Sequence, residues 1–158
     1  MYVSKHIFLG IIFGLILFFI FPAVGIYGIL IVVFSSVLID VDHYLLYIKK
    51  KKDFSLRNAY KWFIENEKKV LSLLRHQRNE IYVGPCIFHG IEILFILIIF
   101  GVFFSKFFLF IFLGFSFHLL LDFIDETTYH DRIDKFSLIH DFFKFKKLKY
   151  VEDYFKNG

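Results

Sequence analysis

The chain has 158 residues with a formal net charge of +4, and 58% of the residues are hydrophobic. Its mean hydropathy of +0.63 is too high for an ordinary soluble domain, and its length predicts a single domain covering 1–158. The single cysteine, Cys86, excludes an internal disulfide framework and is interpreted as a small apolar filler.

Four apolar segments are long enough to be predicted as transmembrane helices, each near the roughly 20 residues that a span requires. They cover about 5–21, 23–43, 83–104 and 107–125. The first ends at Pro22, and almost no polar residue separates it from the second, so these two are expected to form a tight hairpin. An alternative interpretation of the first segment is a cleaved signal peptide, because Lys5 precedes the apolar run and Ala23 and Gly25 follow it.

The basic residues are concentrated in the loop 49–80 and in the tail 126–158, whereas the other two turns carry only Lys106. By the positive-inside rule, this distribution predicts that the loop and both termini are cytoplasmic, in a protein of the plasma membrane. It favours membrane orientation, with lipids as partners, over nucleic-acid binding.

The loop also contains apolar residues at helical spacing, and Tyr60 and Trp62 are typical of a helix lying at a membrane surface. The predicted fold is therefore an all-α, polytopic integral membrane protein with about four transmembrane helices and cytoplasmic amphipathic helices. The loop helix is expected to be either a lid or an anchor.

Eight ionisable side chains lie in or beside the predicted spans. They are His6, Asp40, Asp42, His43, His89, Glu92, His118 and Asp122. A charged group at the centre of a spanning helix costs about 2.5–3.5 kcal/mol on insertion scales, so a compensating partner is required. The predicted spans alternate in direction across the membrane, and each helical residue advances about 1.5 Å along the axis. Placed by depth in this way, all eight side chains lie towards the cytoplasmic ends of their spans. We therefore expect them to converge in one layer near that face.

Spacing within the helices supports this convergence, because residues three or four apart share a helix face. The pairs are His118 with Asp122, His89 with Glu92, and Asp40 with His43. Imidazole and carboxylate together suit Zn²⁺, Mn²⁺ or Fe²⁺ better than Ca²⁺. The layer therefore predicts a divalent metal site, with Zn²⁺ or Mn²⁺ preferred. Each pair could instead be a structural hydrogen-bonded contact between helices.

Three strings carry a resemblance to a known family. They are His6 followed by Gly10, Asp40-Val-Asp42-His43, and Gly114-x-x-x-His118-x-x-x-Asp122. In this order they resemble the predicted membrane-bound metal-dependent hydrolases, which include LexA-regulated inner-membrane members, over roughly 5–125. The resemblance implies a membrane-embedded metal site and a hydrolytic activity.

The chain departs from that family at the third span, where the family often has His-Arg-Gly-x-Thr-His-Ser. Aligning His89 with the second His places Gly84 and Pro85 where the first His and the Arg belong. The sequence here continues to Glu92, which is expected to replace the missing ligand. The resemblance is therefore to a divergent member of the family.

The predicted metal ligands are His89, His118, Asp122 and Asp42, with Asp40 as a further ligand or catalytic residue. Glu92 is expected to be a ligand or the general base. His6 and His43 are interpreted as supporting groups or ligands of a second metal.

The favoured hypothesis is hydrolysis of an ester or phosphoester, including a lipid, near the cytoplasmic face. The alternatives are a proton- or ion-coupled transporter, and a non-catalytic metal-binding or structural membrane protein. The spans are almost uniformly apolar in their other half, which argues against a continuous polar pathway.

Overall fold

The computed structural model describes residues 3–130, 133 and 137–156, and most of these residues are helical. The elements in chain order are α1 (Val3–Ile20), η1 (Pro22–Val24), α2 (Gly25–Leu38), α3 (Val41–Lys51), α4 (Leu56–Ser72), α5 (Arg75–Arg78), β1 (Ile81–Tyr82), α6 (Ile91–Phe103), α7 (Phe107–Asp125), η2 (Glu126–His130), α8 (Leu138–Phe145), β2 (Lys149–Tyr150) and α9 (Val151–Lys156). Parts of the predicted tail 126–158 lie outside the described residues.

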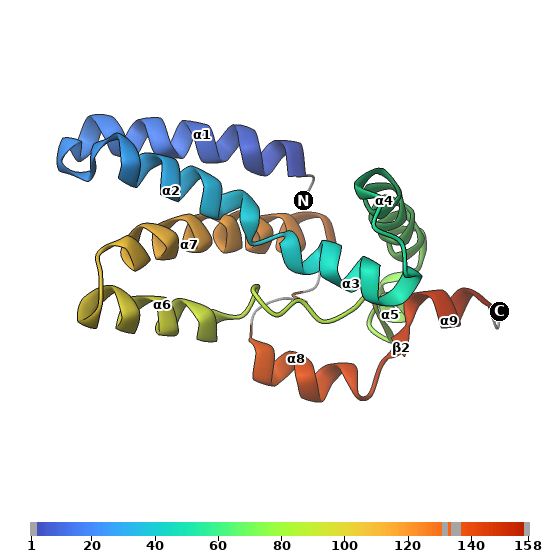
Figure 1. The fold of residues 1–158 in the computed structure, drawn as a ribbon. Coiled ribbons are helices and arrows are strands. Elements are labelled where there is room, and N and C mark those ends of the chain that lie inside the picture. The colour runs from blue at the N-terminus through green and yellow to red at the C-terminus, as the bar shows by residue number, and fades with distance from the viewer. Residues whose placement is uncertain (1–2, 131–132, 134–136, 157–158) are drawn as a thin grey trace.

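Helices α1, α2, α6 and α7 lie side by side as a bundle at one end of the molecule (Figure 1). α1 and α2 form one antiparallel hairpin, α6 and α7 form a second, and the contact between α2 and α7 joins the two. Leu17, Ile29 and Val32 are buried between the helices. The outward faces are also apolar: Phe19 and Phe103 are each more than three-quarters exposed, at 79% and 77%. A surface of this kind suits a lipid environment rather than water.

Two helical segments are long and apolar enough to cross a membrane, namely Pro22–Lys51 with 30 residues and Phe107–Thr128 with 22 residues. The helices at Ser4–Ile20 and Ile91–Phe103 are apolar but shorter. The prediction of membrane-spanning helices is thus supported for two of the four segments. The count of four stays a prediction.

The third predicted span, 83–104, becomes helical only at Ile91. Before it, Gly84 has a positive φ of 157° and Pro85 follows, so the chain cannot form a regular helix here. The second predicted span is interrupted as well, because α2 ends at Leu38 and α3 begins at Val41. Both interruptions fall where the predicted polar residues are found.

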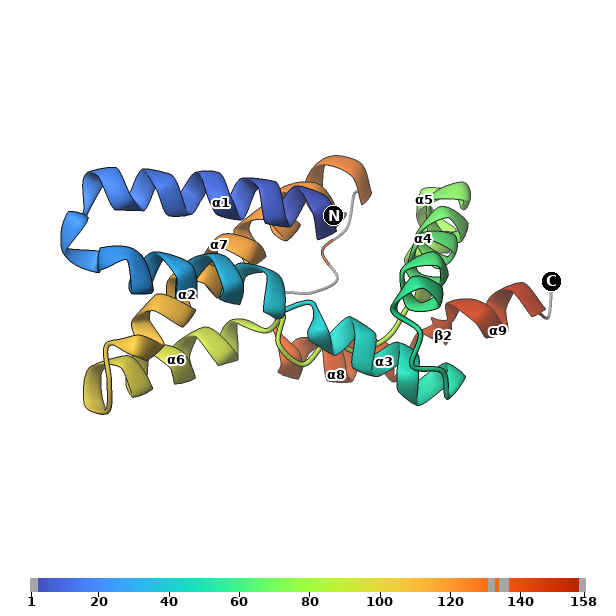
Figure 2. The same ribbon diagram turned by 45° about the horizontal axis from the view of Figure 1, so that its top comes forward.

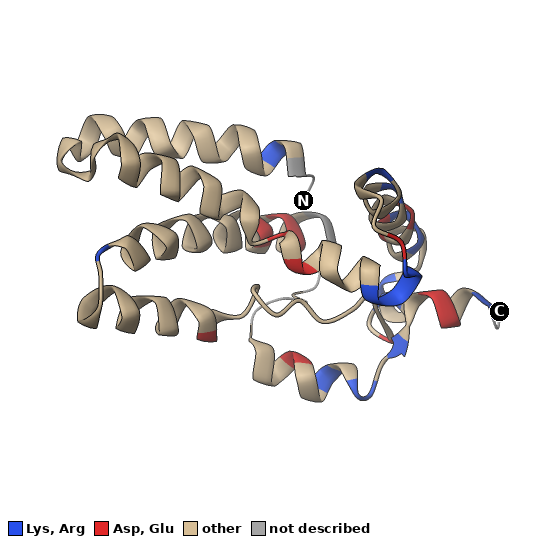
Figure 3. Ribbon diagram, viewed as in Figure 1, with Lys and Arg blue, Asp and Glu red and all other residues tan. Residues whose placement is uncertain are grey.

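The other end of the molecule is formed by α3, α4, α8, α9 and a short parallel pair of strands, β1 and β2 (Figure 2). The strand pair is a small departure from the all-α prediction: Ile81 pairs with Lys149 and Tyr82 with Tyr150. The amphipathic loop helix is observed as α4, and Trp62 of its buried face packs with Tyr47 of α3. Most of the charged residues gather at this end, whereas the bundle carries few (Figure 3).

One polar contact ties α9 to α3 and α4. The Glu152 carboxylate accepts from Lys51 Nζ at 2.7 Å and from Trp62 Nε1 at 2.6 Å. Burial raises the pKa of Glu152, but these two hydrogen bonds and the positive charges of Lys51 and Lys156 together lower it by more, so the pKa lies below its ordinary value of 4.5. The ionised form of Glu152 therefore stabilises the folded state.

The contact between α2 and α7 is close because Gly114 faces the α2 backbone. A Cβ at this position would lie 2.4 Å from Val32 O and 2.0 Å from Ser35 Oγ. Small residues commonly allow helices in membranes to approach in this way.

We expect Gly114→Ala to reduce the free energy of unfolding by about 1–3 kcal/mol, because the new methyl group meets backbone that cannot move aside. The measurement is the melting temperature in detergent. Gly10→Ala is the matched control: its methyl group would meet only the Ser36 side-chain oxygen, at 2.6 Å, which can rotate. Equal melting temperatures for wild type and Gly114→Ala would contradict the close approach.

We expect the stability contributed by Glu152 to be complete above pH 4.5, the ordinary pKa of the residue, and to be lost as the pH falls below it. Glu152→Gln should lower the melting temperature at neutral pH. It should also reduce the fall in melting temperature that the wild type shows as the pH drops below 4.5. Glu65→Gln, on the exposed face of α4, is the control. A Glu152→Gln profile that overlays the wild type would show that the contact contributes nothing.

Candidate metal centre

Seven of the eight predicted site residues converge where the bundle meets the charged end of the molecule. α1 contributes His6, the α2–α3 junction contributes three residues, the segment before α6 contributes His89, and α7 contributes two. The junction residues are Asp40, Asp42 and His43, and those of α7 are His118 and Asp122. His6, His89 and His118 are at most 1% exposed, so the cluster is formed inside the protein.

At the centre of the cluster lie four donor atoms, which we call the inner group: Asp40 Oδ1, His89 Nε2, His118 Nε2 and Asp122 Oδ2. Each imidazole nitrogen is 3.5 Å from Asp40 Oδ1. From Asp122 Oδ2, His89 Nε2 lies at 3.5 Å and His118 Nε2 at 3.3 Å. These separations are wider than ordinary hydrogen bonds. The donor atoms of Asp40, His89 and His118 all lie within 4.8 Å of one another, and so do those of His6, His118 and Asp122. The inner group can therefore hold a metal ion.

Hydrogen bonds on the far side of each imidazole orient the ring. His118 Nδ1 donates to Ser36 O at 2.6 Å, and His89 Nδ1 donates to Asp42 Oδ2 at 3.0 Å. Because a carbonyl and a carboxylate only accept, the Nδ1 atoms carry the hydrogens and the Nε2 atoms present lone pairs to the inner group. Metal-binding histidines are commonly held by such outer hydrogen bonds.

The interruption between α2 and α3 makes one of these hydrogen bonds possible. In a continuous helix the Asp40 N–H would bond Ser36 O, four residues back. Here it bonds Val37 O at 3.2 Å, which leaves the Ser36 carbonyl for His118. The same interruption places Asp40 at the start of α3, where its side chain reaches the inner group.

His6 and His43 lie beside the inner group. His6 Nε2 is 3.1 Å from Asp122 Oδ1, and its ring stacks on His118 with centroids 3.9 Å apart. His43 Nε2 is 3.5 Å from Asp40 Oδ1. His6 thus holds the second oxygen of Asp122, and His43 faces Asp40.

Several buried polar atoms of the cluster make no hydrogen bond within the described part of the chain, and they include His6 Nδ1, His118 Nε2, Asp40 Oδ2 and Asp42 Oδ1. A buried polar atom without a partner typically costs about 1–3 kcal/mol. Native proteins seldom leave several such atoms together without an ion or water. A cation bound in the cluster would compensate for the inner-group carboxylates and satisfy His118.

Glu92, the remaining predicted site residue, occupies a different position. Its carboxylate accepts from Ser137 Oγ at 2.6 Å, from the backbone N–H of Leu138 at 2.9 Å and from that of Ile139 at 3.3 Å. It therefore caps the N-terminus of α8. None of the possible metal-binding groups among the described residues includes it, and its observed contacts are those of a helix cap.

Two contributors to the cluster are not predicted from the sequence. Ser36 acts through its backbone carbonyl, and nothing in a sequence marks such an atom. Cys86 lies with Sγ 3.2 Å from His43 Nδ1, although it was interpreted as an apolar filler. Its position directly after Gly84 and Pro85, in a stretch that cannot be helical, was the available signal.

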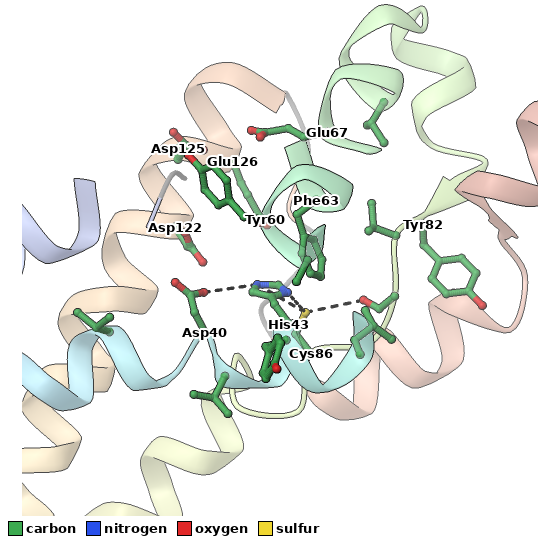
Figure 4. A pocket seen from close by; sticks show the side chains of 18 of the residues that line it. Asp40, His43, Tyr60, Phe63, Glu67, Tyr82, Cys86, Asp122, Asp125 and Glu126 are labelled. Carbon is green, nitrogen blue, oxygen red and sulfur yellow. Dashed lines mark hydrogen bonds and ion pairs between the residues drawn. The ribbon is translucent and has the colours of Figure 1, made fainter. Parts of the chain in front are cut away.

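A cavity of about 620 Å³ opens beside the inner group, between α3, α4 and the segment around β1. Asp40, His43, Cys86 and Asp122 reach it at one end, as Figure 4 shows. Most of the remaining lining is apolar and includes Tyr60 and Phe63 of α4, which covers the cavity. The amphipathic loop helix is therefore one wall of the cavity.

No family model, curated protein or solved structure matches this chain. The resemblance to membrane-bound hydrolases therefore stays an expectation, and the chemistry of the site rests on its geometry.

We expect His6→Phe to weaken metal binding about 10- to 100-fold, the usual effect of removing an outer hydrogen bond from a ligand. Phe keeps the ring stack on His118 but cannot hold Asp122 Oδ1. The measurement is competition with a chromophoric chelator in detergent. Glu92→Gln, which changes only the α8 cap, should leave the affinity unchanged. An unaltered metal affinity in His6→Phe would contradict the positioning role of His6. Loss of one full equivalent of bound metal would instead identify His6 as a ligand.

Proposed function

We propose that this chain is an integral membrane, metal-dependent hydrolase that cleaves an ester or phosphoester near the cytoplasmic face. The observation that carries the proposal is the spacing of the inner group. A tetrahedral zinc ion with ligands at about 2.0–2.1 Å has those ligands about 3.3–3.4 Å apart. Four of the six pairs within the inner group lie at 3.3–3.5 Å, close to this spacing.

The proposed ligands are Asp40, His89, His118 and Asp122, and the proposed metal is Zn²⁺ or Mn²⁺. Two imidazoles with two carboxylates suit either ion. Asp42 and His6 are assigned as the groups that hold His89 and Asp122 in position. Asp40 keeps its predicted role as a ligand or catalytic residue, whereas Asp42, predicted as a ligand, is assigned a positioning role at this centre.

The proposed membrane placement has both termini and α4 on the cytoplasmic side. Its support is the pair of helices long enough to span, the exposed apolar faces of the bundle, and the basic residues gathered at the opposite end. The inner group then lies just below the interface, where the polar part of a lipid can reach it.

When bound, the ion supplies Lewis-acid polarisation of the scissile group and lowers the pKa of a water molecule towards neutrality. The residues of the chain are assigned to orient the reacting groups and to exclude bulk water. Asp40 lines the cavity and its Oδ2 makes no hydrogen bond within the described residues, so we assign this atom to accept a proton from the attacking water. Tyr60 and Phe63 line the cavity, and we assign them to limit the entry of bulk water.

The proposed substrate is an amphiphile. The cavity has the volume of an ordinary small-molecule site. Its lining is mostly apolar, with the donors of the metal centre at one end and three further carboxylates, Glu67, Asp125 and Glu126. An acyl or isoprenoid chain would occupy the apolar part while the ester or phosphoester group lies at Asp40 and Asp122.

The test is hydrolysis of chromogenic esters, phosphodiesters and phospholipid vesicles by detergent-purified protein, with elemental analysis of the same samples. We expect Zn²⁺- or Mn²⁺-dependent turnover that a chelator abolishes. His118→Ala and Asp122→Ala should each lower kcat by more than about 100-fold, since outer residues alone cost 10- to 100-fold in such sites.

His140→Ala is the matched control, because the side chain of His140 is 66% exposed on α8. Turnover unchanged in the His118 and Asp122 variants would refute the mechanism. Stoichiometric metal without turnover on any substrate would favour a non-catalytic metal-binding protein.

A further inference from the structure

A second group of donors adjoins the inner group on the side of the segment before α6. Asp42, His43, Cys86 and His89 each offer one ligand atom, and these atoms all lie within 4.8 Å of one another. Within this group His89 Nδ1 lies 3.0 Å from Asp42 Oδ2. Cys86 and His43 are also close, with Cys86 Sγ 3.2 Å from His43 Nδ1. Both of these residues line the cavity (Figure 4).

The Asp42 carboxylate gives independent evidence that this group takes a ligand. Its Oδ2 accepts from Phe88 N–H at 2.9 Å and from His89 Nδ1 at 3.0 Å. Its Oδ1 is buried and makes no hydrogen bond within the described part of the chain, and the side chain is only 4% exposed. A bound cation would satisfy this oxygen, which the inner group does not use.

The two groups use different atoms of the residues that connect them. His89 presents Nε2 to Asp40 and Asp122 and Nδ1 to Asp42. His43 likewise presents Nε2 to Asp40 and Nδ1 to Cys86. Asp42, His43 Nδ1 and Cys86 can therefore bind an ion without removing any donor from the inner group.

We propose that Asp42, His43 and Cys86 form a second metal position that selects thiophilic divalent ions such as Zn²⁺ or Cd²⁺. A thiolate is a soft ligand, whereas Mg²⁺, Ca²⁺ and Mn²⁺ prefer oxygen. The inner group has nitrogen and oxygen donors only, so the two positions differ in metal preference. The proposal concerns binding and does not depend on hydrolysis by the first centre.

Ligation replaces the thiol proton, because the thiolate is the form of cysteine that binds metal. The proton leaves to the solvent through the cavity, which Cys86 and His43 both line. The Cys86 side chain is otherwise buried, with a residue exposure of 8%. An ion at this position would therefore shield the sulfur from reagents that enter the cavity.

The single cysteine makes the test specific, because any thiolate-to-metal absorption band must come from Cys86. Detergent-purified full-length protein is titrated with Co²⁺ and with Cd²⁺ in thiol-free buffer, and near-ultraviolet absorbance and bound metal are measured. We expect two equivalents and a thiolate band in the wild type. Cys86→Ser should lose the band and one equivalent, and His118→Ala should lose the other equivalent but keep the band.

A second measurement uses the wild type alone, so that it does not require the serine variant to fold. Zn²⁺ should slow alkylation of Cys86 by iodoacetamide at least tenfold, whereas Mg²⁺ should have no effect. Bound Co²⁺ without a thiolate band, or equal alkylation rates with and without Zn²⁺, would overturn the second position. So would loss of the band in His118→Ala, which would assign Cys86 to one shared centre.

These outcomes separate the second position from the hydrolase proposal. A band that persists while no substrate is cleaved supports the second position and counts against hydrolysis. Turnover that survives in a folded Cys86→Ser variant, together with a band in the wild type, supports both.

Discussion

The burial of carboxylates and imidazoles at the end of an apolar bundle is the constraint on which the rest of this structure depends. Asp122 is 5% exposed and His118 is fully buried, on a helix whose other residues are mostly apolar. Isolated charges in such surroundings are expensive. Asp122 and Asp40 face His89 and His118 at 3.3–3.5 Å, and a cation between them would balance the two negative charges.

The backbone is irregular at the places that bring these carboxylates and imidazoles together. The interruption at Asp40 frees the Ser36 carbonyl to orient His118, and the non-helical segment that contains Gly84 and Pro85 brings His89 to the same point. Gly114 lets α7 approach α2 closely enough for these contacts. These irregular segments supply donors to the centre from two different parts of the chain.

The charged end of the molecule contributes a wall of the cavity beside the site. α4 packs on α3 through Trp62 and Tyr47, and the contact of Glu152 with Lys51 and Trp62 fixes α9 to both helices. This arrangement holds Tyr60 and Phe63 over the cavity that begins at Asp40. The amphipathic helix is thus both a surface element and a wall of the cavity.

The sequence by itself determined the apolar helices, the amphipathic helix α4 and the layer in which the polar side chains converge, because hydropathy and spacing are local properties that a single chain carries. It named seven of the residues that the structure brings together. Only the tertiary structure decided their arrangement: Asp40 faces the inner group while Asp42 lies behind His89, Glu92 caps α8, and Cys86 meets His43. These outcomes depend on how each helix is rotated and where it is interrupted, and long-range packing at positions such as Gly114 sets both.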